Sequence, residues 1–200
     1  MISMERAVFL DRDGTIIEDI GYINDCSKII FLPGVTESIK LLNESGFKVI
    51  VVTNQAGVAR GYFTEETANE INHCVWHMLA DKGAFIDKIY YCPHHIEGTV
   101  DEYKKDCYCR KPNPGMIEKA AYEFDIDLSN SFLIGDKSSD IEAGLRVGCK
   151  TILLAYENYG GEENEPELMA HYVAKDLYEA AKWLLDFSGR KQSGFTKLNC

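Results

Sequence analysis

Two carboxylates stand close together in the sequence, immediately after an apolar run. Residues 7–10 are apolar, and Asp11-Arg12-Asp13-Gly14-Thr15 follow them. A short apolar run that ends at a turn signal is typical of a buried strand in a parallel sheet, and ligands bind beyond the carboxyl ends of such strands. Crowded carboxylates repel each other, and a hard cation such as Mg²⁺ between them relieves that repulsion. The pair therefore predicts a magnesium site, with a solvated strand-end turn as the alternative.

Polar side chains also stand where later strands are expected to end: Thr53 with Asn54, Lys111, and Asp136 with Asp140. This spread suits phosphoryl transfer, because the transferred group carries charge on three oxygens and catalysis consists mostly of positioning and neutralising it. A carboxylate is a known nucleophile for this chemistry, through an aspartyl-phosphate that water then hydrolyses. The pattern favours an enzyme that transfers phosphoryl groups to water.

Each of these residues receives a role on this hypothesis. Asp11 is the predicted nucleophile. Asp13 is the predicted acid and base, which protonates the leaving oxygen and later activates the water. The Thr53 hydroxyl and the Lys111 ammonium are expected to hold the phosphoryl oxygens. Taken singly, a threonine at a strand end is usually a cap and a lysine is usually a solvated surface charge, so the prediction depends on their combination.

The predicted magnesium ligands are the carboxylates of Asp11, Asp13 and Asp136. Asp140 is expected to support this set or Lys137 rather than to bind the ion directly. The pattern Gly-Asp-x-x-x-Asp is also common at strand-to-helix turns, and that reading is the alternative when the pattern is taken alone.

A second group of metal-ligating residue types begins at the end of a predicted strand. Cys92 and His94 form one pair and Cys107 and Cys109 form the other. Three sulfurs and one imidazole suit a tetrahedral structural Zn²⁺. His95 is an alternative ligand to His94, and buried thiols beside a surface histidine pair are the alternative to a metal site. A closed four-ligand site leaves no open position for substrate, so we expect a zinc loop over residues 92–109 that holds the residues after it in place.

Composition and charge disfavour several other classes of protein. The chain has 200 residues, of which 46% are hydrophobic and 26% charged, and this suits one globular domain. We expect that domain over residues 1–187 and a disordered tail over 188–200. The net charge of −11 argues against nucleic acid or an anionic membrane as a partner. No apolar run could span a bilayer and the N-terminus lacks a signal-peptide layout, so we expect a cytoplasmic protein. We also expect it to be a monomer and to act on a small molecule.

The cysteine count gives a further expectation. Seven cysteines are an odd number, and without an export signal a disulfide framework is not expected. Cys74, Cys149 and Cys200 have no ligand-type neighbours, so they are expected to be core or tail thiols.

Strand and helix patterns alternate along the chain, which indicates βαβ units and a Rossmann-like α/β fold, a parallel sheet with helices on both faces. The expected strands cover residues 7–10, 47–52, 86–91, 131–134, 150–154 and 171–174. The expected helices begin at residues 33–34, cover 64–83, run from Pro114 to about Phe124, and cover 140–147 and 177–187. Residues 94–110 and the Gly- and Glu-rich residues 157–167 are expected loops. No long insertion separates the first strand from its helix, so no large cap domain is expected.

The chain resembles the haloacid dehalogenase-like phosphatases over about residues 7–150. Their four sequence signatures are matched, in the same order, by the groups at Asp11, Thr53, Lys111 and Asp136. Longer pieces resemble one subgroup, the D-glycero-D-manno-heptose-1,7-bisphosphate 7-phosphatases with the related histidinol-phosphate phosphatases. These pieces are LDRDGT at 10–15, GY at 21–22, VTNQAGVARG at 52–61, YYCPHH at 90–95 and CYCRKPNPGM at 107–116. The resemblance favours His94 over His95 as the zinc ligand.

The resemblance also implies a set of substrate contacts: Asp19, Gly21, Tyr22, Thr53, Asn54, Gln55, Arg110 and Lys137. The planar five-donor fork of Arg110 independently suits a second phosphate or several hydroxyls, with a surface arginine as the alternative. Tyr22 alternatively packs only against its own loop. Asn54 and Gln55 alternatively satisfy turn backbone.

The leading hypothesis is magnesium-dependent removal of the 7-phosphate from a heptose bisphosphate, and the nearest alternative is the same chemistry on histidinol phosphate. A nucleic-acid 3′-end phosphatase would need a basic groove, which the net charge of −11 disfavours. A non-catalytic zinc module would not need a competent residue at every predicted catalytic position.

Overall fold

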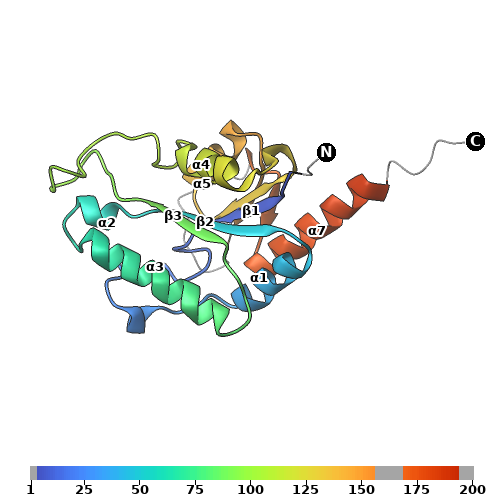
Figure 1. The fold of residues 1–200 in the computed structure, drawn as a ribbon, viewed down its shortest axis with the longest axis horizontal. Coiled ribbons are helices and arrows are strands. Elements are labelled where there is room, and N and C mark those ends of the chain that lie inside the picture. Colours follow the sequence, from blue (N-terminus) through green and yellow to red (C-terminus); the bar gives the residue numbers. More distant parts are fainter. Residues whose placement is uncertain (1–3, 156–168, 194–200) are drawn as a thin grey trace, which may run out of the picture.

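The computed structural model describes residues 4–155 and 169–193. Within them, six strands form one sheet with the order β3-β2-β1-β4-β5-β6 (Figure 1). The strands are β1 (Ala7–Leu10), β2 (Lys48–Asn54), β3 (Lys88–Cys92), β4 (Phe132–Gly135), β5 (Lys150–Leu154) and β6 (Tyr172–Ala174). Every neighbouring pair is parallel. The predicted parallel sheet is confirmed, and each strand begins and ends within two residues of its predicted limits.

Helices cover both faces of this sheet (Figure 1). One face carries α1 (Val35–Glu44), α3 (Glu65–Ala80) and α7 (Leu177–Ser193), and the other carries α4 (Gly115–Phe124) and α5 (Ser138–Arg146). The short helices α2 (Ala56–Ala59), η1 (Cys26–Lys28) and η2 (Leu128–Asn130) lie in connections. Among the described residues, no helix combines the length and the apolar character needed to cross a membrane.

α7 is longer than the sequence pattern predicts. It continues to Ser193, past the expected end at residue 187 and into the segment expected to be a tail. Residues 188–193 lack apolar periodicity, but an existing helix is extended at the gain of one backbone hydrogen bond per added residue. The Ser188 hydroxyl also donates to the Leu184 carbonyl at 2.8 Å. Residues 194–200 and the expected loop at 157–167 lie outside the described part of the chain.

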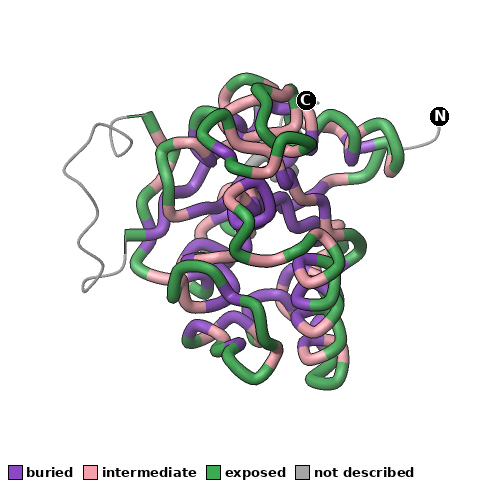
Figure 2. Tube along the Cα trace, turned by 90° about the vertical axis from the view of Figure 1, so that its left-hand side faces the viewer, coloured by how far each residue is buried: buried purple, intermediate pink, exposed green. Residues whose placement is uncertain are grey.

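Alternate side chains of the central strand enter two separate cores. Val8 and Leu10 of β1 pack with the α1, α3 and α7 layer, whereas Ala7 and Phe9 pack with the α4 and α5 layer. Successive side chains of a strand point to opposite faces, so a strand buried on both sides has a continuous apolar sequence. Figure 2 shows buried residues running through the centre of the molecule.

The segment between β1 and α1 contains η1 and isolated β-bridges, and no inserted domain. This agrees with the expectation that no large cap covers the carboxyl end of the sheet. Among the described residues, the β1–α1 segment that follows this end of the sheet is a loop, and it carries Asp19, Gly21 and Tyr22.

The cysteine prediction is wrong for one pair. Cys26 of η1 and Cys74 of α3 form a disulfide, with their Cα atoms 6.0 Å apart and a sequence separation of 48. The bond ties the β1–α1 segment to α3. An odd cysteine count could not reveal this pair, because it depends on η1 packing against α3. Cys149 is a buried free thiol, as predicted, and Cys200 lies outside the described residues.

Candidate active site

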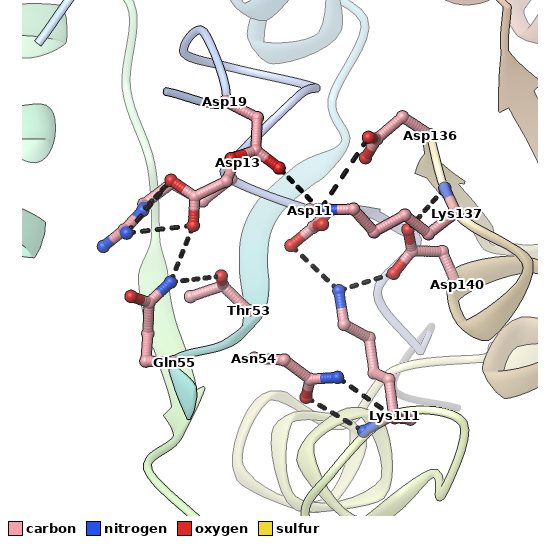
Figure 3. A network of polar contacts seen from close by, with 11 residues as sticks. Asp11, Asp13, Asp19, Thr53, Asn54, Gln55, Lys111, Asp136, Lys137 and Asp140 are labelled. Atoms are coloured by element: carbon pink, nitrogen blue, oxygen red, sulfur yellow. Dashed lines mark hydrogen bonds and ion pairs between the residues drawn. The ribbon is translucent and has the colours of Figure 1, made fainter. Parts of the chain in front are cut away.

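The strand order brings the carboxyl ends of β2, β1 and β4 side by side. The polar residues predicted from the sequence gather at this edge (Figure 3). Asp11 follows β1, Thr53 lies one residue before the end of β2, and Asp136 follows β4. Lys111 comes from the loop between β3 and α4, next to the end of β2. Four separate segments thus contribute to one site.

A buried lysine lies among three carboxylates. Asp11, Asp136 and Asp140 each place a carboxylate oxygen within 4.8 Å of the others. Lys111 Nζ lies 2.9 Å from Asp11 Oδ1 and 2.6 Å from Asp140 Oδ1, and the residue is 3% exposed. Burial alone would lower the pKa of Lys111, but the charges of Asp11 and Asp140 raise it above its ordinary value. The ammonium therefore stays charged beside Asp11.

Asp136 has a buried carboxylate oxygen that no protein donor in the described part of the chain satisfies. Its Oδ1 is buried without a hydrogen-bond partner, and Lys137 Nζ lies 3.9 Å from Oδ2. Burial, with the charge of Asp11, raises the pKa of Asp136 to about 7, and burial raises the pKa of Asp140 to about 6. A side chain on Gly14 would collide with the Asp136 carboxylate. Closely spaced carboxylate oxygens of this kind, one of them unpaired, fit a hard divalent cation such as Mg²⁺.

The carboxylate of Asp13 lies outside that set of three. Arg12 Nη2 donates to it at 3.0 Å and Gln55 Nε2 donates to it at 2.8 Å. Arg12 is itself buried, and its Nη1 donates to Asn72 Oδ1 at 2.7 Å. The side chain of Asp13 is therefore held by protein donors, and its place among the magnesium ligands stays a prediction. Arg12 and Asn72 were not predicted; the one signal for Arg12 was its place between two aspartates.

The residues at the end of β2 hold their neighbours in the site. Gln55 Nε2 also donates to Thr53 Oγ1, at 2.9 Å. Asn54 Nδ2 donates to the Lys111 carbonyl and Asn54 Oδ1 accepts from the Lys111 N–H, both at 3.0 Å. The amide nitrogen of Gln55 is thus shared between Asp13 and Thr53. Asn54 therefore binds the backbone of a distant residue and Gln55 binds two side chains, whereas the alternative interpretation had both amides satisfy turn backbone; their predicted substrate contacts stay predictions.

A rim of charged and polar groups lies beside the carboxylates (Figure 3). Lys137 Nζ pairs with Asp19 Oδ2 at 2.9 Å, and Asp19 Oδ1 accepts the Gly21 N–H at 3.0 Å. Gly21 has a φ of 89°, a conformation that favours glycine. Tyr22 is 43% exposed. The structure therefore brings Asp19, Gly21 and Lys137 together next to the site, with Tyr22 at its outer edge.

The four predicted zinc ligands lie together in the loop after β3. The sulfurs of Cys92, Cys107 and Cys109 are 3.2 to 3.4 Å apart. His94 Nδ1 lies 3.4 Å from Cys109 Sγ and 3.8 Å from Cys92 Sγ. Ligands about 2.3 Å from a tetrahedral zinc stand about 3.8 Å apart. The donor set and its spacing therefore fit one Zn²⁺.

The three thiols of this cluster differ in pKa: the hydrogen bond with Cys109 and burial raise the pKa of Cys92, and burial raises that of Cys107, whereas the pKa of Cys109 is lowered. Hydrogen bonds from Cys92 and Cys107 lower the pKa of the Cys109 thiol to about 5, and the thiolate is the form that binds metal. His95 Nδ1 accepts a backbone N–H of its own loop instead, that of Glu97, at 3.1 Å. Arg110 Nη1 donates to the His94 carbonyl at 3.2 Å, which ties Arg110 to the cluster.

Known phosphatases are similar to this chain in sequence. Residues 108–180 match the family model described as HAD-hyrolase-like. The chain is 46% identical over 178 residues to the D-glycero-beta-D-manno-heptose-1,7-bisphosphate 7-phosphatase of Photorhabdus laumondii, an alignment that covers 88% of this chain and 95% of that protein. The chain belongs to the haloacid dehalogenase-like phosphatases.

Two further comparisons agree with this haloacid dehalogenase-like phosphatase assignment. The D-glycero-alpha-D-manno-heptose-1,7-bisphosphate 7-phosphatase of Burkholderia mallei is 46% identical over 149 residues, which cover 74% of this chain and 79% of that protein. The crystal structure of D,D-heptose 1,7-bisphosphate phosphatase from B. bronchiseptica, complexed with magnesium and phosphate, is 33% identical with a TM-score of 0.76, and covers 91% of this chain and 99% of that chain. The predicted family is confirmed, and the chain is a phosphoric monoester hydrolase.

Proposed function

We propose that this phosphatase removes the 7-phosphate of D-glycero-D-manno-heptose 1,7-bisphosphate, with Mg²⁺ as cofactor. The observation that carries the choice of substrate is the 46% identity to a heptose bisphosphate 7-phosphatase over 88% of the chain. The site supports the type of reaction, because a carboxylate, a buried ammonium and two further carboxylates share one sheet edge.

Asp11 is the proposed nucleophile. Its carboxylate attacks phosphorus, the bond from phosphorus to the sugar oxygen breaks, and Asp13 protonates that leaving oxygen. Asp13 then accepts a proton from water as the water attacks the phosphorus of the aspartyl-phosphate. This step releases phosphate and restores the carboxylate of Asp11. Arg12 and Gln55 hold the Asp13 carboxyl group in one orientation for both proton transfers.

The groups around Asp11 are proposed to neutralise the negative charge of the phosphoryl group and of the nucleophile. Mg²⁺ held by Asp11 and Asp136 would reduce the repulsion between the anionic nucleophile and the anionic phosphoryl group. Lys111 and the Thr53 hydroxyl are the proposed protein donors to the phosphoryl oxygens, and one such donor typically contributes about 10²- to 10³-fold in rate. Asp140 accepts from Lys111 Nζ and from the Lys137 N–H, so it is proposed to hold these two residues in position.

The zinc cluster is proposed to be structural. Its four protein ligands leave no position open for substrate, and the loop that contains them leads directly into Arg110 and Lys111. Arg110 is bonded to the backbone of one ligand, His94. The bound metal would therefore fix the position from which Arg110 meets the substrate and from which Lys111 enters the site.

The remaining predicted substrate contacts are proposed to form the rim of the site. Arg110 offers a planar donor fork suited to a second phosphate or to hydroxyls. Lys137 and Asp19 form an ion pair beside Asp136, and Gly21 and Tyr22 continue that loop outward. Together these groups are proposed to contact the sugar and the phosphate that is retained.

A substrate panel tests this proposal. The purified chain with Mg²⁺ is assayed on the α and β anomers of heptose 1,7-bisphosphate and on histidinol phosphate, and phosphorus NMR identifies the ester that is lost. We expect the larger kcat/KM for a heptose bisphosphate, with heptose 1-phosphate as product. A larger kcat/KM for histidinol phosphate would reassign the substrate. Asp11→Asn protein from the same preparation should show no turnover, which excludes a contaminating phosphatase.

A further inference from the structure

Tyr22, at the outer edge of the site, is held by packing against the segment that follows β2. Its ring centroid lies 4.4 Å from that of Tyr62 and 6.5 Å from that of Phe63. Gly57 of α2 lies beneath it, where an added Cβ would stand 2.9 Å from Tyr22 Cδ1. The ring thus has a defined seat, although 43% of the residue is exposed.

The hydroxyl of Tyr22 has a specific partner in Arg60, for which the sequence predicts no role. Arg60 Nη1 donates to Tyr22 Oη at 2.9 Å. The second nitrogen of the same fork, Nη2, lies 3.6 Å from Glu97 Oε2 in the zinc loop. A guanidinium can hold two partners at once in a fixed geometry, whereas a lysine ammonium is a point charge on a flexible stem.

The backbone beside Arg60 is fixed to the zinc loop. The Ala59 carbonyl accepts the Thr99 N–H at 2.7 Å and the Val100 N–H at 3.0 Å. The Arg60 N–H donates to the Ala56 carbonyl at 3.0 Å, which closes α2. α2 lies next to the loop that follows β3 (Figure 1). Arg60 therefore extends from a backbone anchored on the zinc loop toward the loop that carries Tyr22.

The ion pair with Glu97 contributes little by itself. The side chain of Glu97 is 74% exposed, and exposed ion pairs contribute about 0–1 kcal/mol to stability. The hydrogen bond from Arg60 to Tyr22 is therefore the contact that connects the zinc loop to the loop of Asp19, Gly21 and Tyr22.

We propose that Arg60 is a positioning residue for substrate binding, which holds Tyr22 at the rim of the site and joins that rim to the zinc loop. Arg60 touches neither the nucleophile nor the phosphoryl donors, so its effect is on KM. The inference rests on the proposed function for the choice of substrate only.

Steady-state kinetics on heptose 1,7-bisphosphate test the role of Arg60. Arg60→Gln should raise KM about tenfold, the loss expected for one charge-assisted hydrogen bond, while kcat changes by less than about threefold. Tyr22→Phe removes the accepting hydroxyl and should raise KM by a similar factor. The double variant should be no worse than either single variant, because both changes remove the same contact. Lys119→Gln, which removes an exposed cation paired with Glu123 on α4, is the matched control and should keep the wild-type KM.

Three outcomes would overturn the role of Arg60. They are an unchanged KM in Arg60→Gln, a loss confined to kcat, and KM increases that multiply in the double variant. If Arg60→Gln does not fold, Tyr22→Phe decides, since it removes only the hydroxyl; an unchanged KM in that variant would overturn the proposal. Absence of wild-type turnover of heptose bisphosphate would instead count against the proposed function, and the same KM ratios would then be measured on the phosphate ester that the enzyme hydrolyses best.

Discussion

Replacing Asn54 with alanine should lower kcat and leave KM nearly unchanged. The Asn54 side chain exchanges two hydrogen bonds of 3.0 Å with the backbone of Lys111. That pair fixes the residue whose Nζ lies 2.9 Å from Asp11 Oδ1. Alanine removes both bonds and leaves the N–H and the carbonyl of Lys111 without these partners, so the backbone that positions the ammonium beside the nucleophile is less well fixed.

The size of this effect follows from the two bonds and the buried groups that they satisfy. Two hydrogen bonds contribute on the order of 2 kcal/mol, and leaving their partners unpaired raises the expected loss of unfolding free energy to about 2–4 kcal/mol. A displacement of about 1 Å in a catalytic group slows a reaction by about 100-fold. Because Lys111 keeps its ion pairs with Asp11 and Asp140, we expect a smaller displacement and a decrease in kcat of about 10- to 100-fold.

Asn43 provides a matched control for this variant. Its Nδ2 donates to the Phe85 carbonyl at 3.0 Å and its Oδ1 accepts from the Phe85 N–H at 2.9 Å. The same pattern of two bonds therefore occurs in α1, on residues that have no part in the site. Urea unfolding and steady-state kinetics on Asn54→Ala and Asn43→Ala should show a loss of stability in both and a loss of kcat in Asn54→Ala alone.

Two results would contradict the assigned role of Asn54. An increase in KM with wild-type kcat would show that its amide binds substrate directly, as the family resemblance implies. Equal decreases of kcat in the two asparagine variants would show that reduced stability, and not the position of Lys111, slows the enzyme.

Three other perturbations have defined outcomes. Mass spectrometry should find zinc in protein purified without chelator, and a chelator should lower the thermal midpoint and loosen residues 92–110; metal-free protein of unchanged stability would exclude the site. The double variant Cys26→Ser/Cys74→Ser should lose about 4 kcal/mol of unfolding free energy in urea, because the disulfide closes a loop of 48 residues; an unchanged urea midpoint would contradict this. His171 Nδ1 accepts the Thr151 N–H at 3.1 Å, and burial, with the charge of Lys150, lowers the pKa of His171 below its ordinary 6.5. The His171 imidazole therefore binds a proton more tightly in the unfolded chain than in the folded one. The contribution of neutral His171 to the free energy of unfolding is present above about pH 6.5 and is lost as the pH falls through the folded-state pKa. His171→Asn keeps an acceptor that does not titrate, and its stability should decrease less than that of wild type between pH 7.5 and 5.5; equal decreases would refute the role of His171.

The position of the site could be predicted from the sequence because parallel strands end at a common edge. Asp11, Thr53 and Asp136 each stand at the end of an apolar run, and the strand order β2-β1-β4 makes these ends neighbours. The clustering of the candidate zinc ligands could be predicted for a related reason, since Cys92 ends a strand and Cys107 and Cys109 lie in the loop that follows it. Residue type and spacing were sufficient to predict these two groups because the geometry of a parallel sheet determines where the strand ends lie.

The partners of individual side chains could not be predicted in this way. Asn54 binds the backbone of a residue 57 positions away, and Arg12 binds Asn72 at a separation of 60 positions. Such contacts depend on the path of the intervening chain, which no local period encodes. The same limit applies to the Cys26–Cys74 disulfide, because the cysteine count carries no information about which helix η1 packs against.

Trapping a phosphorylated Asp11 is the most direct test of the catalytic role assigned to this carboxylate. Asp13→Asn cannot activate the attacking water, and p-nitrophenyl phosphate has a leaving group that needs no proton. This variant, mixed with that ester and Mg²⁺ and quenched in acid, should therefore carry one phosphoryl group on the peptide that contains Asp11, as measured by mass spectrometry. Asp11→Asn should carry none and should not turn over substrate. An unmodified Asp11 peptide in the quenched Asp13→Asn protein, or wild-type turnover by Asp11→Asn, would contradict attack on phosphorus by this residue.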